Sequence, residues 1–251
     1  MSGHSKWATI KRKKGALDAK RGKIFTKLIK EIQVAAKMGG PDDSANPRLR
    51  SAIQAAKTQN MPTVNIERAI AKGTGQIEGE IYEEISYEGY GPGGVAILIK
   101  TLTDNKNRTV SEIRHILTKA GGNLATSGSV SYLFETKGII TIKKNCCTED
   151  DLLLVTLDAG ADDIRSDDEF FTVITDTSAF EDVKAALEEA KIAIEEASIS
   201  MEPSTTVKVD EELAPKILGV MEALEDHDDI QNVYANFDID DEILSKLQED
   251  E

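Results

Sequence analysis

Lysine and arginine side chains gather at the start of this sequence in a spacing that suits phosphate binding. Between residues 11 and 30, nine basic side chains are interrupted by one acid, Asp18. Self-repulsion in such a field opposes folding, which favours a polyanionic partner over a merely solvated helix face. Clustered cations bind nucleic acid because they neutralise phosphates and release counterions. The predicted nucleic-acid contacts are Lys6, Trp7, Lys11, Arg12, Lys13, Lys14, Lys20, Arg21, Lys23, Lys27 and Lys30.

The same segment is better equipped for phosphates than for bases. Arg12 and Arg21 are the only arginines before residue 48, and residues 1–32 contain no Asn or Gln. Lysine is a point charge that does not read base edges as arginine and asparagine do. We therefore predict weak sequence discrimination on duplex DNA and appreciable binding to structured RNA. Trp7 is the single tryptophan, and it lies in the leader, the polar segment that precedes the first predicted helix. Its ring can either stack on a base or pack the leader onto the helices that follow.

Three glycines, Gly89, Gly91 and Gly94, match the G-x-G-x-x-G pattern of a dinucleotide-binding turn. Such a turn lies between a strand and a helix, whereas the residues that follow here, VAILIK, have the pattern of a strand. Pro92 also removes one amide donor from the phosphate cradle. The glycines therefore predict a tight connection between two strands, and no cofactor is expected.

The remaining reactive side chains do not converge on a catalytic or metal site. No GxSxG elbow surrounds Ser127 or Ser129, and no calcium-loop spacing occurs in the acidic cluster at residues 162–169. That cluster is either a solvated surface or a docking surface for a basic protein. We predict no enzyme activity, no metal and no small-molecule substrate. The scattered histidines and adjacent cysteines are His4, His115, His227, Cys146 and Cys147.

Charge divides this chain of 251 residues into two regions. The formal net charge is −15, with a pI of about 4.7, yet residues 1–72 hold 16 basic against 5 acidic residues. The rest of the chain therefore carries −26. Opposite signs in different segments predict different partners for them. No run approaches the ~18 apolar residues of a membrane span, and free cysteines suit a reducing compartment, so we expect a cytoplasmic protein without a membrane partner.

Helical periodicity dominates the basic region. From residue 23 to residue 37 the apolar side chains fall on one arc and the lysines on the opposite arc. Pro47 and Pro62 each mark the start of a further helix, and Gly73 marks an end. These signals predict a small three-helix module.

Strand patterns begin at residue 82, and the segment from residue 135 to residue 205 has the order β-α-β-β-α-β of a ferredoxin-like sandwich. Two incomplete sets remain, ββα before this segment and αβ after it. Neither can bury a core alone, so we expect them to form one domain interrupted by the other. The predicted fold is α+β, with a basic all-helical domain at 1–77, a discontinuous middle domain at 78–134 and 206–240, and a ferredoxin-like domain at 135–205 inserted in it.

Seven ordered blocks of this sequence resemble the YebC/PmpR family, from residue 3 to about residue 237. The family's members are described as probable transcriptional regulatory proteins, and it includes the mitochondrial translational activator of cytochrome c oxidase. The blocks are GHSKWATIKRKKGALDAKRGKIFTKLIKEI, NPRLRSAI, NMPTVNIERAI, YEGYGPGGVAILI, LTDNKNRTVSEIRH, GGNLATSGSVSYLF and PSTTV.

The resemblance implies a cytoplasmic protein of three domains without known catalytic activity. It implies either a DNA-binding transcriptional regulator or a ribosome-associated translation factor that binds ribosomal RNA and helps translation through proline-rich stretches. A basic face serves the phosphates of either partner. A small-molecule-handling α+β protein is the rival of a different class, and the lack of a convergent catalytic set weighs against it. We therefore expect a non-enzymatic, nucleic-acid-binding regulator, a DNA-binding transcriptional regulator of this family, with the ribosome-associated translation factor as the alternative.

Overall fold

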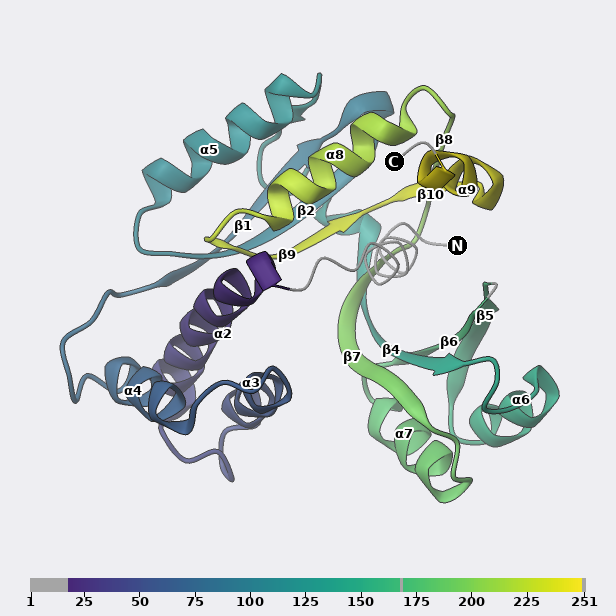
Figure 1. The fold of residues 1–251 in the computed structure, drawn as a ribbon, viewed down its shortest axis with the longest axis horizontal. Helices are drawn as coiled ribbons and strands as arrows, with labels where there is room; N and C mark the ends of the chain where they lie inside the picture. The colour runs from purple at the N-terminus through teal and green to yellow at the C-terminus, as the bar shows by residue number, and fades with distance from the viewer. Residues whose placement is uncertain (1–17, 168, 250–251) are drawn as a thin grey trace. The chain divides into compact units, whose positions relative to one another are not determined.

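The structure, a computed structural model, describes residues 18–167 and 169–249. The fold is α+β with antiparallel sheets, as predicted (Figure 1). Contacts divide the chain into two compact units. One unit comprises the described residues up to Ser131 with Val209–Ala235 and the segment from Ile239 onward; the other comprises Tyr132–Lys208 and Asn236–Asp238. None of the described helices is both long and apolar enough to cross a bilayer.

The described part of the basic region, from residue 18 onward, forms three helices, α2 (Asp18–Gly39), α3 (Pro47–Thr58) and α4 (Thr63–Gly73). The periodic apolar side chains of α2 pack against α3 and α4 around a buried cluster that includes Ile32, Leu49 and Ile66. Pro47 is the first residue of α3, where proline is favoured because its missing amide hydrogen is not needed. Pro62 directly precedes α4, which begins at Thr63. The described residues of this region agree with the predicted helical amino-terminal domain, and the extent of that domain, residues 1–77, stays a prediction.

A sheet of order β3-β1-β2-β9 follows, and it joins segments that are far apart in the sequence. The strands are β1 (Glu83–Tyr90), β2 (Ala96–Thr103), β3 (Asn123–Leu124) and β9 (Ile230–Ala235). Strand β9 pairs antiparallel with β2, which is buried along nearly its whole length. The early ββα set is therefore completed by a strand that comes after the inserted segment. The domain boundaries near residues 77, 134 and 206 stay a prediction.

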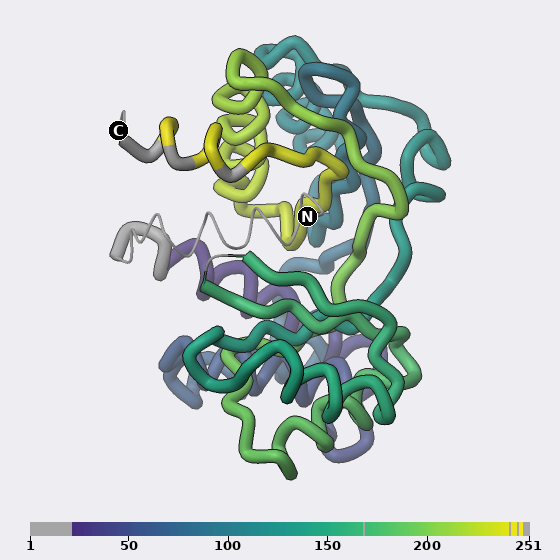
Figure 2. The backbone as a smooth tube through the Cα atoms, turned by 90° about the vertical axis from the view of Figure 1, so that its right-hand side faces the viewer, coloured from purple at the N-terminus to yellow at the C-terminus, as the bar shows by residue number. Residues whose placement is uncertain are grey.

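Two helices, α5 (Lys106–Lys119) and α8 (Ala214–Glu225), lie side by side on one face of this sheet (Figures 1 and 2). Their buried residues, among them Ile113, Leu117 and Ile217, face the strands. This packing fixes the amino-terminal end of α5 and the carboxyl-terminal end of α8, where the candidate site lies.

The glycine-rich segment after β1 is a strand connection, as predicted. A short 3-10 turn, Pro92–Gly94, joins β1 to β2, and the Gly91 amide donates to the Val95 carbonyl oxygen at 2.8 Å. Gly93 and Gly94 adopt φ of 71° and 77°, which residues with a side chain rarely tolerate. Because a strand follows the turn, there is no helix N-terminus here to hold a pyrophosphate.

The second unit contains a sheet of order β5-β6-β4-β7 covered by two helices, the arrangement of a ferredoxin-like fold. Its elements are β4 (Phe134–Lys143), α6 (Glu149–Leu157), β5 (Ala161–Ser166), β6 (Phe170–Asp176), α7 (Phe180–Glu189) and β7 (Ile194–Pro203). The chain ends in the short paired strands β8 (Val207–Val209) and β10 (Phe237–Ile239) and helix α9 (Asp241–Glu249).

Candidate functional site

The structure describes three of the predicted nucleic-acid contacts in full: Lys23, Lys27 and Lys30 on α2. Lys20 and Arg21 belong to the same helix, but their side chains lie outside the described residues. The leader positions also lie outside the described residues: Lys6, Trp7, Lys11, Arg12, Lys13 and Lys14. The geometry of the site can therefore be built from the three lysines on α2.

All three lysines contact the carboxyl-terminal end of α8 or the loop that follows it. The Lys27 Nζ donates to the Glu225 carbonyl oxygen at 2.6 Å, and the Lys23 Nζ donates to the Asp226 carbonyl oxygen at 3.1 Å. Lys30 Nζ donates to the Asp228 carbonyl oxygen at 2.9 Å. Spacings of three and four residues place lysines on one helix face. Carbonyls at a helix end lack helical donors and carry partial negative charge, so the lysines satisfy and stabilise them.

Lys30 and Asp229 form the buried centre of this contact. Their side chains are 8% and 3% exposed, and Nζ lies 2.6 Å from Oδ1. The other carboxylate oxygen, Oδ2, accepts from Arg108 at 2.8 Å and from Thr109 at 2.7 Å on α5. The centroid of the Tyr82 ring lies 5.3 Å from Lys30 Nζ. One carboxylate therefore ties α2 to the start of α5.

The electrostatics of this cluster favour the charged forms. Burial opposes ionisation of Asp229, but hydrogen bonds from Arg108, Lys30 and Thr109 outweigh it and hold the pKa of the carboxyl well below its ordinary value. Hydrogen bonds to Asp229 and Asp104 likewise raise the pKa of Arg108. The cluster is thus a charged, hydrogen-bonded junction.

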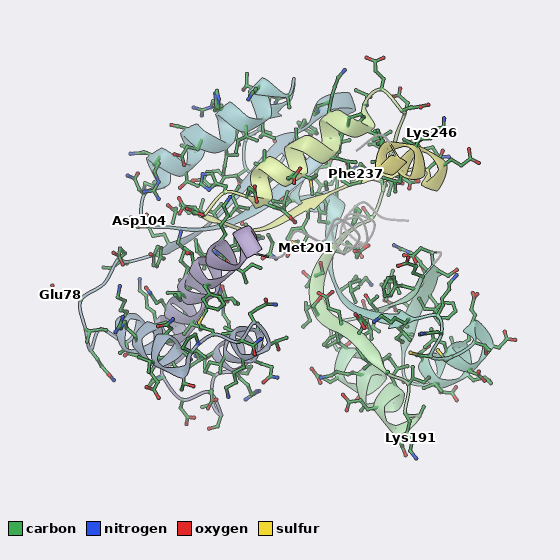
Figure 3. All side chains as sticks on the ribbon, in the orientation of Figure 1. Glu78, Asp104, Lys191, Met201, Phe237 and Lys246 are labelled. Atoms are coloured by element: carbon green, nitrogen blue, oxygen red, sulfur yellow. The ribbon has the colours of Figure 1, made fainter. Side chains whose placement is uncertain are left out.

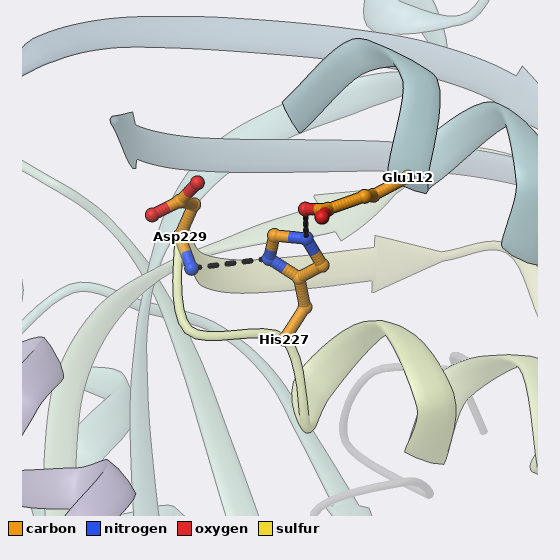
Figure 4. A group of neighbouring side chains, drawn as sticks. All are labelled: Glu112, His227 and Asp229. Atoms are coloured by element: carbon orange, nitrogen blue, oxygen red, sulfur yellow. Dashed lines mark hydrogen bonds and ion pairs between the residues drawn. The ribbon is translucent and has the colours of Figure 1, made fainter. Parts of the chain in front are cut away.

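His227 lies beside this junction with Glu112 and Asp229, and their ligand atoms lie within 4.8 Å of one another (Figure 4). The Asp229 backbone amide donates to His227 Nδ1 at 3.1 Å, which leaves Nε2 to donate to Glu112 Oε2 at 2.7 Å. Both oxygens of the Asp229 carboxylate already contact cations. A metal ion here would meet an ammonium and a guanidinium, so this chemistry suits a structural junction better than a metal centre.

A second buried carboxylate, Glu88 on β1, organises the loop before Ser131. Its Oε2 accepts from the Val130 and Ser131 amides at 2.6 and 2.9 Å, and its Oε1 accepts from the Gly128 amide at 2.8 Å. Burial opposes ionisation, but these three backbone donors outweigh it and lower the pKa of Glu88. Glu88 therefore supplies hydrogen-bond acceptors for three backbone amides of this loop.

Asp229, Arg108 and Glu88 were not among the site residues predicted from the sequence. Arg108 and Thr109 do lie in one of the blocks that resemble the family, LTDNKNRTVSEIRH, and this position was the signal in the sequence that could have pointed to them. Asp229 is one acid among several in the segment EDHDD, and nothing in its local pattern distinguishes it. Only the pairing of β9 with β2 brings it to α2 and α5.

Acidification is expected to weaken this junction. Because the pKa of Asp229 is lowered in the folded chain, its stabilisation is complete above the ordinary carboxyl range, about pH 4, and is lost as the pH falls below it. Urea unfolding followed by circular dichroism at pH 7, 5 and 3 should show a midpoint that falls between pH 5 and pH 3. Asp229→Asn should show a shallower fall, and equal slopes for the two proteins would contradict this account.

Comparison with known proteins gives matches over nearly the whole length. A family model described as the TACO1/YebC protein N-terminal domain matches residues 5–76, and one described as the TACO1/YebC second and third domain matches residues 82–237. Relatives from Syntrophobacter fumaroxidans and Syntrophus aciditrophicus, each named "Probable transcriptional regulatory protein", are 58% and 59% identical over 248 residues. These matches cover 98% of this chain and 100% and 99% of the relatives.

A solved structure also resembles this chain closely. The crystal structure of a conserved hypothetical protein from Aquifex aeolicus has a TM-score of 0.80 at 51% sequence identity. The match covers 90% of this chain and 94% of the other. The agreement in both sequence and fold extends beyond any single domain.

Proposed function

We propose that this chain, which belongs to the TACO1/YebC family, is a DNA-binding transcriptional regulator that acts without catalysis. The family resemblance predicted from the motif blocks is confirmed. Relatives that match it from end to end are named probable transcriptional regulatory proteins, which supports a regulatory role. DNA as the ligand, the absence of catalysis and a cytoplasmic location are parts of the proposal.

The main support for the proposal is the positive net charge of the amino-terminal region. Residues 1–72 carry +11 within a chain of −15. This excess suits a polyanion, because each neutralised phosphate releases counterions. Since the end of α8 and the loop after it engage the ammonium groups of Lys23, Lys27 and Lys30, we assign the phosphate contacts to the other basic residues of the predicted set. They are Lys6, Lys11, Arg12, Lys13, Lys14, Lys20 and Arg21, whereas uncharged Trp7 keeps its predicted stacking or packing role.

Ribosomal RNA is the alternative ligand. The names of the relatives refer to transcription, and none of the described features favours ribosomal RNA over DNA. Translation support is therefore not proposed, and ribosomal RNA serves as a competitor in the tests.

A variant in which Lys11, Arg12, Lys13 and Lys14 are replaced by Ala tests the phosphate assignment. Loss of four phosphate contacts should lower the slope of log K against log salt by about 3–4 for duplex DNA. Fluorescence anisotropy with a labelled random duplex between 50 and 200 mM salt measures this slope. An unchanged slope would place the DNA contact elsewhere.

The matched control for this titration is Lys23→Ala combined with Lys27→Ala. These side chains contact carbonyls at the end of α8, so the control should keep most of the wild-type slope and unfold at lower urea. A fall in slope as large as that of the leader variant would move the phosphate contacts onto the described face of α2.

A further inference from the structure

Helix α5 presents an outward face whose composition differs from that of the rest of this acidic chain. Its buried residues, Thr109, Ile113 and Leu117, face the sheet. The opposite face carries no carboxylate along its centre, although the chain has 45 acidic residues against 30 basic ones. The exposed residues nearest the centre of this face are Asn107, Ser111, His115 and Thr118, with Arg114 on one flank and Glu112 at the same angle on the other flank.

Apart from Glu112, these side chains make no hydrogen bond or ion pair with another element within the described residues; the Ser111 hydroxyl donates to the Asn107 carbonyl oxygen of its own helix at 2.8 Å. Two residues of α5 do make such contacts, because Arg108 pairs with Asp104 and Asp229, and Glu112 contacts His227. In contrast, Arg114, Lys106 and Lys119 take part in no ion pair within the described residues. Figure 3 shows nitrogen-tipped side chains along the outer side of this helix, which begins just after Asp104.

We propose that α5 is a base-reading helix that enters the major groove of DNA. This inference rests on the proposed function and gives it a means of recognising sequence. It departs from the weak sequence discrimination predicted from the lysine-rich amino-terminal segment, because α5 lies outside that segment. Arginine pairs bidentately with guanine, asparagine pairs bidentately with adenine, and serine or threonine bonds to several base edges. The exposed face of α5 holds these residue types, whereas the predicted contacts of the leader and α2 are almost all lysine.

The spacing of the face fits the groove. Asn107, Ser111, Arg114 and Thr118 follow one stripe, and eleven residues of helix span about 16 Å. That length covers four to five base pairs at about 3.4 Å per base along a strand. The DNA major groove is about 12 Å wide and admits a helix. The major groove of duplex RNA is too deep and narrow for side chains to read, so the occupant is DNA.

The ends of α5 suit a helix that must be held in place. Lys106 and Lys119 are exposed at opposite ends of the helix, about 20 Å apart, where ammonium groups can contact phosphates beside the groove. The Asn105 side chain caps the first turn by accepting from the Arg108 amide. Arg108 and Thr109 tie the same turn to buried Asp229, so the reading face has a rigid support.

Selection of bound sequences from a random duplex library tests the inference. The full-length protein should enrich a short motif of about four to five base pairs. Arg114→Lys keeps the charge and removes the bidentate fork, so it should keep affinity for random DNA and lose about tenfold or more discrimination at one position. Asn107→Ala should relax a second position about three base pairs away, given about 10 Å along the helix.

Lys216→Gln on α8 is the control, because it removes an exposed cation outside the reading face and should leave the enriched motif unchanged. Enrichment of the same motif by wild type, Arg114→Lys and Asn107→Ala would overturn the assignment of α5. Binding to random duplex with its salt dependence but no enriched motif would also overturn it and leave the proposed function standing. Failure to bind any duplex, or complete displacement of duplex by ribosomal RNA at equal concentration, would overturn both.

Discussion

Replacement of Asp229 with Asn is expected to lower the free energy of unfolding by about 3–5 kcal/mol, because it leaves a buried lysine without its counter-ion. The carboxylate of Asp229 is 3% exposed and contacts Lys30 through one oxygen and Arg108 and Thr109 through the other. An asparagine side chain has the same shape as aspartate but no charge. Its amide nitrogen is a hydrogen-bond donor and would face partners that are themselves donors. Urea unfolding at pH 7 followed by circular dichroism measures the loss.

Two further variants separate the ion pair from other effects. Asp228→Asn is the matched control, because this neighbouring side chain is exposed and the change should cost less than about 0.5 kcal/mol. Lys30→Met should cost less than Asp229→Asn, since Asp229 keeps Arg108 and Thr109. The double variant should lose less than the sum of the two single losses. Strict additivity, or a loss for Asp229→Asn no larger than that of Asp228→Asn, would contradict the buried pair.

The fold could be predicted because its determinants are local in the sequence. The apolar arc of α2, the prolines at the starts of α3 and α4, and the order of elements from β4 to β7 are each visible within short windows. The union of the early ββα set with the late αβ set in one domain followed from a different argument, and the structure adds that β2 and β9 are the strands that pair. Two incomplete sets of elements each needed a partner to bury apolar surface, and each was the other's only candidate.

The junction at Asp229 could not be predicted in this way. Lys23, Lys27 and Lys30 share one helix face, and a lysine face has the same pattern whether it meets phosphates or carbonyl oxygens. The partners of these lysines lie about 200 residues away, at a helix end that is defined only when α8 has packed beside α5. A buried carboxylate also has no local signature, because its burial depends on which strands pair.

Replacement of Glu88 with Gln is expected to lower the free energy of unfolding by about 2–3 kcal/mol, because three amides lose a charged acceptor. The Val130 amide is buried, and a glutamine at position 88 would present one acceptor oxygen and one competing donor to the three N–H groups. The loop cannot recover these bonds from water without opening. Amide hydrogen exchange should therefore accelerate at Gly128, Val130 and Ser131 more than elsewhere in the sheet.

Glu83→Gln on the same strand is the control for this change. Glu83 is exposed, so the substitution should alter the free energy of unfolding by less than about 0.5 kcal/mol and leave the exchange of the loop unchanged. Because the pKa of Glu88 is lowered in the folded chain, its contribution should disappear as the pH falls below about 4, and Glu88→Gln should then approach wild type. A gap between Glu88→Gln and wild type that persists undiminished at pH 3 would show that the loop depends on the shape of the side chain rather than on its charge.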